Sequence, residues 1–470
     1  MLLGFIFIYL LITIAIGWWA SRRVKNTSDF VVAGRRLPLM LAACASFATW
    51  FGSETLMGAS AEFVNSGLIG VVEDPFGAAL CLILIGAFYA RKLYRLNILT
   101  FCDFFRIRFS KAAEFLSALF IVPSYFGWIA AQLVAMAIIL QTLTQIPFVY
   151  GIITCTVVVI IYTYIGGMWA VSITDFVQTI MIIIGLFFLL FQLNQQAGGV
   201  EKVLASTPKG FFKFTPEPNL TSIVGYFAAW ITIGLGSIPQ QDVFQRVMAA
   251  KSERISEYAC YLAGIMYLTI GFIPLYIGLC AKNLYPELLA AGSDPQMLLP
   301  QMVLQHTGTF MQIMFFGALM SAILSTTSGA VLAPATIIGE NLIKPHIKNL
   351  SDRRLLQIMR FSVVGVAIAS ALMTGWNTNI YELVGLSSAF SLVSLFVPLT
   401  AGLYWKKASN FGALLSMSTG MAVWIVFEWM PTDIPSLVWG LLASIVAMIV
   451  GSFWKPDVAG ASLEDGRIGR

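Results

Sequence analysis

Long apolar segments follow one another along almost the whole chain, separated by short polar stretches rich in arginine and lysine. About 20 apolar residues suffice for an α-helix to cross the hydrocarbon core of a bilayer. By length and hydropathy, the pattern predicts an all-α membrane protein with about 13 transmembrane helices. The predicted spans are 2–20, 38–66, 70–90, 112–142, 147–165, 172–194, 221–245, 257–281, 308–340, 358–375, 379–404, 411–430 and 434–454. Several spans exceed about 25 residues, so we expect tilted, bent or broken helices.

The positive charges favour one orientation in the membrane. If the N-terminus lies outside, the predicted cytoplasmic loops hold all but four of the 28 lysine and arginine residues. The four outside are Lys202, Lys209, Lys213 and Lys282. An excess of lysine and arginine marks cytoplasmic loops, so an odd number of spans is favoured. No long polar linker divides residues 1–454, which are expected to be a single transmembrane domain with a short cytoplasmic tail at 455–470.

Composition argues against a soluble protein, a histidine-rich metalloprotein and an enzyme. Hydrophobic residues make up 58% of the chain and charged residues 11%, whereas about a quarter of a soluble domain is charged. The six cysteines lie mostly within apolar runs and lack paired or metal-ligand spacing, so we interpret them as core residues. With only His306 and His346, a histidine-rich metal site is excluded. No set of nucleophile and base indicates an enzyme, and nothing predicts an organic cofactor, a nucleic acid or an obligate protein partner.

Two predicted helices contain polar residues, glycine or proline near their middle. The second carries Ala48-Thr-Trp-Phe-Gly-Ser-Glu-Thr55, and the seventh carries Gly234-Leu-Gly-Ser-Ile-Pro-Gln-Gln-Asp242. Such residues at membrane depth are costly unless the freed backbone groups face a cavity. Because the interruptions lie five helices apart, residues 38–194 and 221–404 are predicted to be two inverted repeats with a solute and ion site at the bilayer midplane.

Hydroxyl side chains gather in the ninth predicted helix, Ser321-Ala-Ile-Leu-Ser-Thr-Thr-Ser-Gly329. Ala322, Ser325 and Thr326 stand at i, i+3 and i+4 and so share one helical face. Converging hydroxyl oxygens suit a small alkali cation, although such residues also bond to their own helix or allow close packing. Asp175, at the start of the sixth helix, is either an interfacial cap or a ligand facing the interior.

Three motifs resemble the solute:sodium symporter family, which includes proline, glucose, sialic acid and choline transporters. They are Gly166-Gly-Met-Trp-Ala-Val-Ser-Ile-Thr-Asp175-Phe-Val-Gln178, Gln241-Asp-Val-Phe-Gln-Arg246 with the following Ala-Ala-Lys251, and Asp29-Phe-Val-Val-Ala-Gly-Arg35. The resemblance extends from about Asp29 to Lys407. It implies a leucine-transporter-like core of five plus five inverted helices, with sodium as the coupling ion.

The resemblance also implies ion ligands. The usual sodium site of the family corresponds to the backbone of Ala48 and Phe51 and to Ala322, Ser325 and Thr326, which we call the ion group. Some members hold a second sodium ion, and the matching residues are Asp175, Ser325 and Ser328. Gly329 stands where another hydroxyl ligand is expected, which leaves that second ion in doubt.

The solute site is most similar to that of the choline transporter branch, where tryptophans enclose a quaternary ammonium. Trp50 and Trp128 match two positions of this cage, and Gln240 replaces a third aromatic residue. Ring faces attract a desolvated cation. The resemblance does not supply the nearby carboxylates of Glu54, Glu73 and Asp74. We expect them to offset the charge of an amine, unless they pair with internal basic groups or Glu73 and Asp74 lie at the outer interface.

The predicted function is sodium-coupled import, by alternating access, of a small cationic or zwitterionic solute with an amine group. A proton-coupled carrier using Asp175, Glu54 or Asp74, a transporter-like solute sensor and a channel are the alternatives. A sensor usually carries a signalling domain, and the short tail at 455–470 makes one unexpected here. Short loops favour the bacterial inner membrane, with the N-terminus outside and the C-terminus in the cytoplasm.

Overall fold

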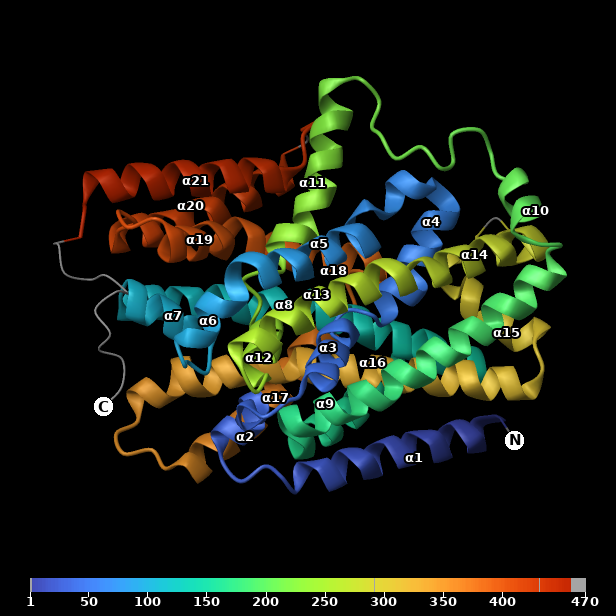
Figure 1. Ribbon diagram of the computed structural model, residues 1–470, viewed down its shortest axis with the longest axis horizontal. Coiled ribbons are helices and arrows are strands. Elements are labelled where there is room, and N and C mark those ends of the chain that lie inside the picture. The colour runs from blue at the N-terminus through green and yellow to red at the C-terminus, as the bar shows by residue number, and fades with distance from the viewer. Residues whose placement is uncertain (1, 291, 431, 458–470) are drawn as a thin grey trace.

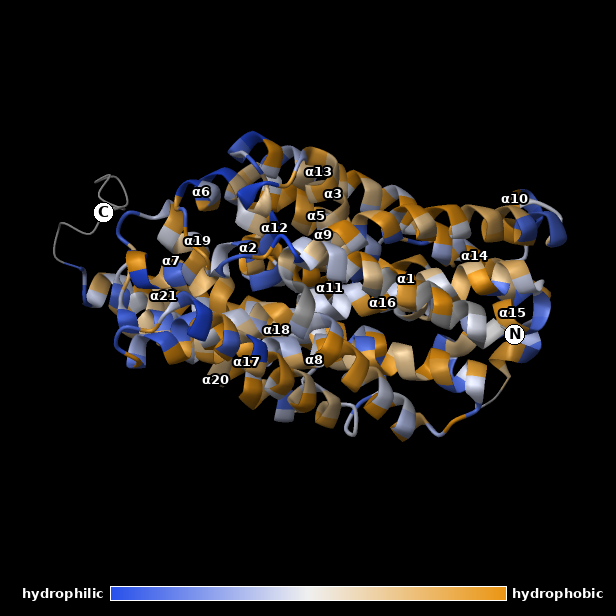
Figure 2. Cartoon of the chain, turned by 90° about the horizontal axis from the view of Figure 1, so that it is seen from below, coloured by the Kyte–Doolittle hydropathy of each residue, from blue (hydrophilic) through white to orange (hydrophobic). Residues whose placement is uncertain are grey.

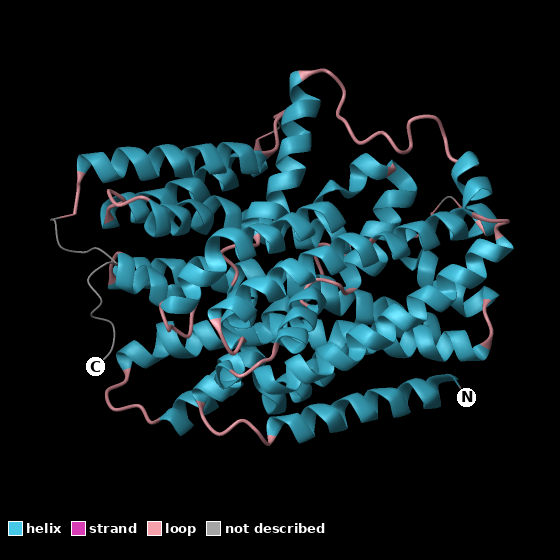
Figure 3. Cartoon of the chain, in the orientation of Figure 1, coloured by secondary structure: helices cyan, strands magenta, loops and turns pink. Residues whose placement is uncertain are grey.

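The computed structural model describes residues 2–290, 292–430 and 432–457, and within these ranges the chain is helical and contains no β-strand (Figure 3). The α-helices are α1 (Leu2–Ser21), α2 (Thr27–Val32), α3 (Leu39–Ala48), α4 (Ser60–Ser66), α5 (Ala78–Leu84), α6 (Ala90–Arg95), α7 (Phe101–Arg108), α8 (Lys111–Thr144), α9 (Phe148–Gln196), α10 (Val200–Ala205), α11 (Leu220–Gly236), α12 (Gln241–Ala249), α13 (Glu253–Ile270), α14 (Phe272–Leu284), α15 (Leu298–His306), α16 (Thr309–Ile337), α17 (Asp352–Met373), α18 (Ile380–Ser391), α19 (Val397–Tyr404), α20 (Asn410–Trp429) and α21 (Ser436–Trp454). Five short π-helical segments are η2 (Glu54–Ala59), η4 (Val72–Gly77), η5 (Ile85–Tyr89), η8 (Ile338–Ile343) and η10 (Leu392–Phe396). Five 3-10 turns are η1 (Ala33–Arg35), η3 (Leu68–Val71), η6 (Pro286–Leu289), η7 (Pro295–Met297) and η9 (Lys344–His346).

The described residues contain nine helices long and apolar enough to cross a membrane, or ten if the bent pair α11 and α12 counts as one span. The nine are Leu68–Arg95, Lys111–Thr144, Gly167–Gln196, Glu253–Leu284, Thr309–His346, Asp352–Met373, Ile380–Tyr404, Asn410–Trp429 and Ser436–Trp454. The predicted number of spans is therefore not confirmed. The predicted spans 2–20, 38–66 and 147–165 correspond to α1, to the interrupted helix that begins with α3, and to a shorter apolar helix, Phe148–Tyr164.

Both predicted interruptions are present. The chain leaves the α-helix after α3 and turns over residues 49–52 before it enters the π-helical segment η2. The axis bends by 49° between α11 and α12. A third break divides α9 at Gly167, where φ is 61° and a Cβ atom would lie 2.5 Å from the Phe30 ring. Glycine adopts this conformation without steric cost, so the Gly-Gly pair of the sequence motif separates two spans.

The helix α16 lies at the centre of the bundle. All residues of its most apolar 18-residue window are buried, and it packs against α8, α9, α17 and α12. At the edges, α1 lies along α9 and α16 on one side, and α20 and α21 pack together on the other (Figure 1). The hydroxyl groups of α16 therefore face other helices and not lipid, which is where polar groups at membrane depth are tolerated.

Polar residues are concentrated at the two ends of the elongated molecule (Figure 2). One end carries α6 and α7, the other carries α10, and the surface between them is predominantly hydrophobic. The helix α1 begins at the end of α10, and α21 ends near α7 (Figure 1). This distribution is typical of an integral membrane protein, whose apolar belt faces the lipid.

Candidate functional site

The break after α3 lies against the polar face of α16. The Thr326 hydroxyl donates a hydrogen bond of 2.9 Å to the Ala48 carbonyl oxygen. A Cβ atom added to Gly52 would lie 3.4 Å from Thr326 Oγ1, so the backbone approaches α16 closely here. Carbonyl and hydroxyl oxygens can replace the hydration shell of an alkali cation. Two residues of the ion group, Ala48 and Thr326, thus come together from helices far apart in the sequence.

The other three residues of the ion group are buried in the same region. Phe51 belongs to the break, and its ring stacks on Phe47 with a centroid separation of 4.5 Å. On α16, Ala322 lies one helical turn before Thr326, and Ser325 lies immediately before it. Their role as sodium ligands remains a prediction.

Asp175 faces the bundle interior and is only 1% exposed. Its Oδ1 atom accepts a hydrogen bond of 2.6 Å from Ser325, which also lies 3.1 Å from the Thr174 hydroxyl. Its Oδ2 atom and the Ser328 hydroxyl are both buried without a hydrogen-bond partner among the described residues. Of the two alternatives left open by the sequence, this placement favours the interior carboxylate over the interfacial cap.

A permanent positive charge lies beside this carboxylate region. The Arg246 Nε atom donates to the Ala45 carbonyl at 3.2 Å, and Nη1 donates to the Asp242 carbonyl at 3.1 Å. A Cβ atom added to Gly329 would lie 2.6 Å from Arg246 Nη2. The position where a further hydroxyl ligand is expected is therefore filled by the guanidinium group, which opposes a second cation by electrostatic repulsion.

A cavity lies on the other side of the break, and we call it the central cavity. Its free volume is about 10 Å³, roughly room for one water molecule, so the lining side chains must move apart to admit a solute. All five residues predicted for the solute site line it: Trp50, Glu54, Asp74, Trp128 and Gln240. The remaining lining residues are Ala78, Ile233, Ser237, Tyr267, Val384, Ser387 and Ser388. Among these described lining residues, none is basic.

Glu54 is held by hydrogen-bond donors on both carboxylate oxygens. Trp128 Nε1 donates to Oε1 at 3.2 Å, while Gln132 Nε2 donates to Oε2 at 2.7 Å. The Ser53 hydroxyl donates to Oε2 at 3.4 Å. Donors that converge on a carboxylate stabilise its ionised form. Trp128 therefore contributes both a ring on the cavity wall and an N–H group that orients the acid.

Asp74 and the hydroxyl groups of Thr55 and Tyr267 form a short hydrogen-bonded chain. The Thr55 hydroxyl donates to Asp74 Oδ2 at 2.7 Å and lies 2.5 Å from the Tyr267 hydroxyl. The Oδ1 atom is buried without a partner among the described residues. Glu73 lies elsewhere, in a peripheral hollow of about 370 Å³ that it shares with Tyr381, Glu382, Trp424 and Glu428.

Sequence reasoning missed Gln132, Thr55 and Tyr267. Gln132 was detectable, because it is a polar residue in an apolar run and stands four positions after Trp128, on the same helical face. Thr55 lies inside the interrupted motif, but its partner Asp74 comes from another helix. Tyr267 has no distinguishing local pattern, so only the tertiary structure places its hydroxyl at the cavity.

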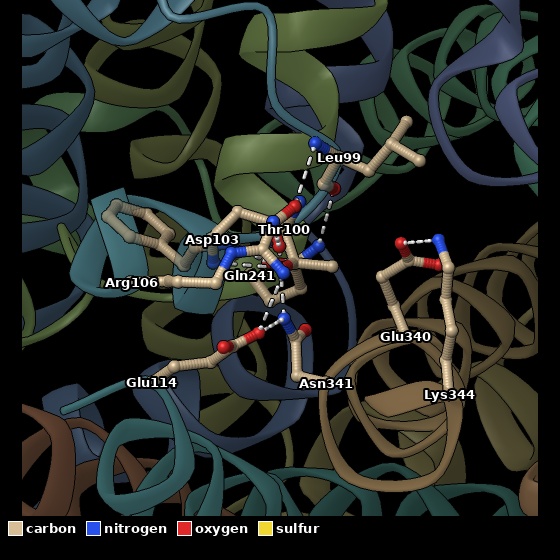
Figure 4. Close-up of polar contacts among 10 residues, drawn as sticks. Leu99, Thr100, Asp103, Arg106, Glu114, Gln241, Glu340, Asn341 and Lys344 are labelled. Carbon is tan, nitrogen blue, oxygen red and sulfur yellow. Dashed lines mark hydrogen bonds and ion pairs between the residues drawn. The ribbon is translucent and has the colours of Figure 1, made fainter. Parts of the chain in front are cut away.

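A polar network joins four segments at the end of the molecule that carries α7 (Figure 4). The capping box of α7, Thr100 with Asp103, fixes the start of that helix. Asn341 donates to Asp103 Oδ1 at 3.1 Å and to Glu114 Oε1 at 2.8 Å, and Arg106 lies within 3.4 Å of both acids. Gln241, at the start of α12, accepts a hydrogen bond of 2.7 Å from the Phe101 amide. The start of α12 is thereby tied to α7, and α7 is in turn linked to α8 and to η8, the π-helical segment that follows α16.

Comparison with known proteins agrees with this architecture. The profile of the sodium:solute symporter family matches residues 30–420. The human high affinity choline transporter 1 is 25% identical over 440 residues, which cover 89% of this chain and 75% of that protein. The osmoregulated proline transporter OpuE of Bacillus subtilis is 27% identical over 473 residues, which cover 93% of each chain.

Solved structures confirm the fold. A Na+-coupled sialic acid symporter in a substrate-bound, outward-open state superposes with a TM-score of 0.83 at 20% identity, covering 97% of this chain and 98% of that one. Mhp1, a nucleobase-cation-symport-1 family transporter, gives a TM-score of 0.58 at 16% identity, covering 91% and 95%. The all-α, leucine-transporter-like architecture predicted from the sequence is thus confirmed. From its family profile and its fold together, the chain belongs to the sodium:solute symporter family.

Proposed function

We propose that the protein imports a small organic solute bearing an amine group together with sodium ions. One observation carries the choice of solute: the central cavity combines two tryptophans with two buried carboxylates, and none of its described lining residues is basic. Tryptophan faces and carboxylates both stabilise a positive charge that has left water. The human and Bacillus relatives are named as transporters of choline and proline, which both contain a positively charged nitrogen.

The ion group supports sodium as the coupling ion. In this proposal the carbonyl oxygens of Ala48, Phe51 and Ala322 and the hydroxyl groups of Ser325 and Thr326 bind one sodium ion. The ion joins the break after α3 to α16, and the same break carries Trp50 and Glu54 into the central cavity. Sodium therefore orders the solute site, and the solute in turn strengthens sodium binding by the same factor, because coupling is reciprocal.

Alternating access follows from the bent and broken helices. The polar network of Figure 4 ties α12 to α7, and α7 to α8 and η8, and we propose that it closes the cytoplasmic side while the site is open to the outside. When ion and solute are bound, the bundle rocks and this network opens. An inward-negative membrane potential contributes about 2.3 kcal/mol per elementary charge per 100 mV. The orientation proposed is N-terminus outside, in a plasma membrane and most simply a bacterial inner membrane.

Proton coupling is a second candidate, and the burial of Asp175 favours it specifically. A carboxylate with one hydroxyl partner and one unpartnered oxygen can exchange a proton in place of binding a second sodium ion. Arg246 beside Gly329 argues against the second sodium ion but leaves proton exchange open. Uptake driven by a pH gradient without sodium would identify this mechanism.

The test is thermal stabilisation of the purified protein by a panel of solutes, in sodium and in potassium. A ligand that binds the folded state raises the melting temperature by mass action. An amine that stabilises in sodium but not in potassium is the expected result, followed by sodium-dependent uptake of the labelled amine into proteoliposomes. If only sugars or anions stabilise, the choice of solute is refuted. If an amine stabilises equally in both salts, sodium coupling is refuted.

A further inference from the structure

The two carboxylates of the central cavity come from different helices and have no basic partner. Glu54 stands in η2 and Asp74 in η4, and they are 2% and 1% exposed. Neither takes part in an ion pair within 4.0 Å among the residues that the structure describes. Uncompensated buried charges are strongly destabilising. Such a pair is neutralised either by protons or by positive charge on a ligand, and an amine ligand supplies the latter.

The two carboxylates differ in their hydrogen-bond partners. Both oxygens of Glu54 accept hydrogen bonds from protein donors, and Trp50 and Trp128 line the same cavity. Asp74 accepts a hydrogen bond from Thr55 on Oδ2, whereas Oδ1 is buried without a partner among the described residues. A buried acceptor without a donor costs about 1–3 kcal/mol. An N–H group of a bound ligand would satisfy this atom.

Charge balance then selects among amines. A ligand with one ammonium group neutralises one carboxylate and leaves the other unpaired. A zwitterion adds a third negative group to a wall on which no described lining residue is basic. Two ammonium groups on one short chain would pair with both acids. On the basis of the function proposed above, we propose that the preferred solute is a dication, a short linear diamine whose two ammonium groups pair with Glu54 and Asp74.

Three ligands of the same length test this directly on the unmodified protein: 1,4-diaminobutane, 1-aminopentane and 5-aminopentanoate. They differ only at one end, which is an ammonium, a methyl or a carboxylate group. Dissociation constants are measured by thermal shift and calorimetry in sodium. We expect the diamine to bind about tenfold or more tightly than the monoamine, since a hydrogen bond to a charged group contributes about 1.5–3 kcal/mol. The amino acid should bind most weakly.

The variant Asp74→Asn should remove most of the advantage of the diamine over the monoamine. The control Glu73→Gln, in the peripheral hollow, should keep that advantage. Stabilisation by sodium alone checks that each variant is folded. The preference for a dication is refuted if the wild-type protein binds the diamine no more tightly than the monoamine. It is also refuted if Asp74→Asn lowers the affinity for both amines by the same factor. If a solute without an amine binds in sodium and none of the three ligands does, the proposed amine function itself fails.

Discussion

The ion group and the central cavity share one helix break but are built from opposite kinds of chemistry. On one side, Ala48 offers a backbone carbonyl that is already hydrogen-bonded to Thr326. On the other side, Trp50 and Glu54 offer an aromatic face and a carboxylate. Residues 48–54 therefore contribute to both regions over seven positions of the chain. A single interruption at membrane depth can serve two ligands because its backbone and its side chains face different neighbours.

Under the proposed function, this difference in chemistry would distinguish sodium from an organic cation by size and hydration. Neutral oxygens bind a small ion by replacing its water shell. Aromatic rings and buried carboxylates suit a larger, weakly hydrated organic cation. Gln132 lies between the regions: its amide N–H group donates to Glu54, and its Oε1 atom lies 3.3 Å from where a Cβ atom of Gly52 would stand. The two regions are chemically distinct but mechanically connected.

The largest effect should come from removing the hydroxyl ligands of the ion group. Ser325→Ala with Thr326→Ala should raise the sodium concentration for half-maximal uptake about 100-fold, since two ligands to a dehydrated cation are lost at about 1.5 kcal/mol or more each. Thr327→Ala is the matched control, because its hydroxyl bonds back to the Ile323 carbonyl of its own helix. Unchanged sodium activation in the double variant would overturn the assignment of the ion group.

Replacing Glu54 should change the affinity for the solute without a matching change in the affinity for sodium. Glu54→Gln keeps the size of the side chain but removes the charge, so affinity for an amine should fall about 10- to 100-fold. Stabilisation of the solute-free protein by sodium should change much less. Calorimetric titration of each ligand measures both quantities. Equal losses of sodium and amine affinity would show that the two regions are not separable.

Gln132→Leu should weaken the connection between the regions. The factor by which sodium raises amine affinity should fall about fivefold, because the hydrogen bond that positions Glu54 relative to the break is lost. Amine affinity is compared at low and saturating sodium. Thr142→Val on the same helix is the control, since that hydroxyl bonds only to its own helix at the Ile138 carbonyl. A coupling factor in Gln132→Leu equal to that of the wild-type protein would exclude Gln132 as the connection between the ion group and the central cavity.

The smallest effect is expected at Asp175. If Arg246 supplies the positive charge beside this carboxylate, wild type and Asp175→Asn should both activate with a Hill coefficient for sodium close to one. Sodium affinity should fall only about two- to threefold, because the amide oxygen of the variant still accepts the hydrogen bond from Ser325 but carries no charge. A coefficient near two in wild type that falls to one in the variant would instead establish a second sodium ion. Loss of pH-driven uptake would establish proton coupling.

The long apolar runs, the two interruptions and the hydroxyl face of α16 were all predictable from the sequence, because they depend on local composition and helical periodicity. The number of spans stays a prediction, since the break near Thr49 and the turn at Gly167 leave two apolar helices, Leu39–Ala48 and Phe148–Tyr164, that are too short to count by length alone. Ala48, Trp50 and Trp128 were found through resemblance to a family. Their grouping around Glu54 was not deducible from spacing, because α8 and the break are more than 70 residues apart.

The sequence by itself determined the membrane-spanning class, the symporter family and which residues could hold a cation. The tertiary structure alone decided that Glu54 and Asp74 share one cavity, that Glu73 belongs to another, and that Arg246 occupies the space beside Gly329. Hydropathy and motifs depend on residues near one another in the chain. Charge balance in a cavity depends on side chains from separate helices, and their pairing is fixed only when the helices pack.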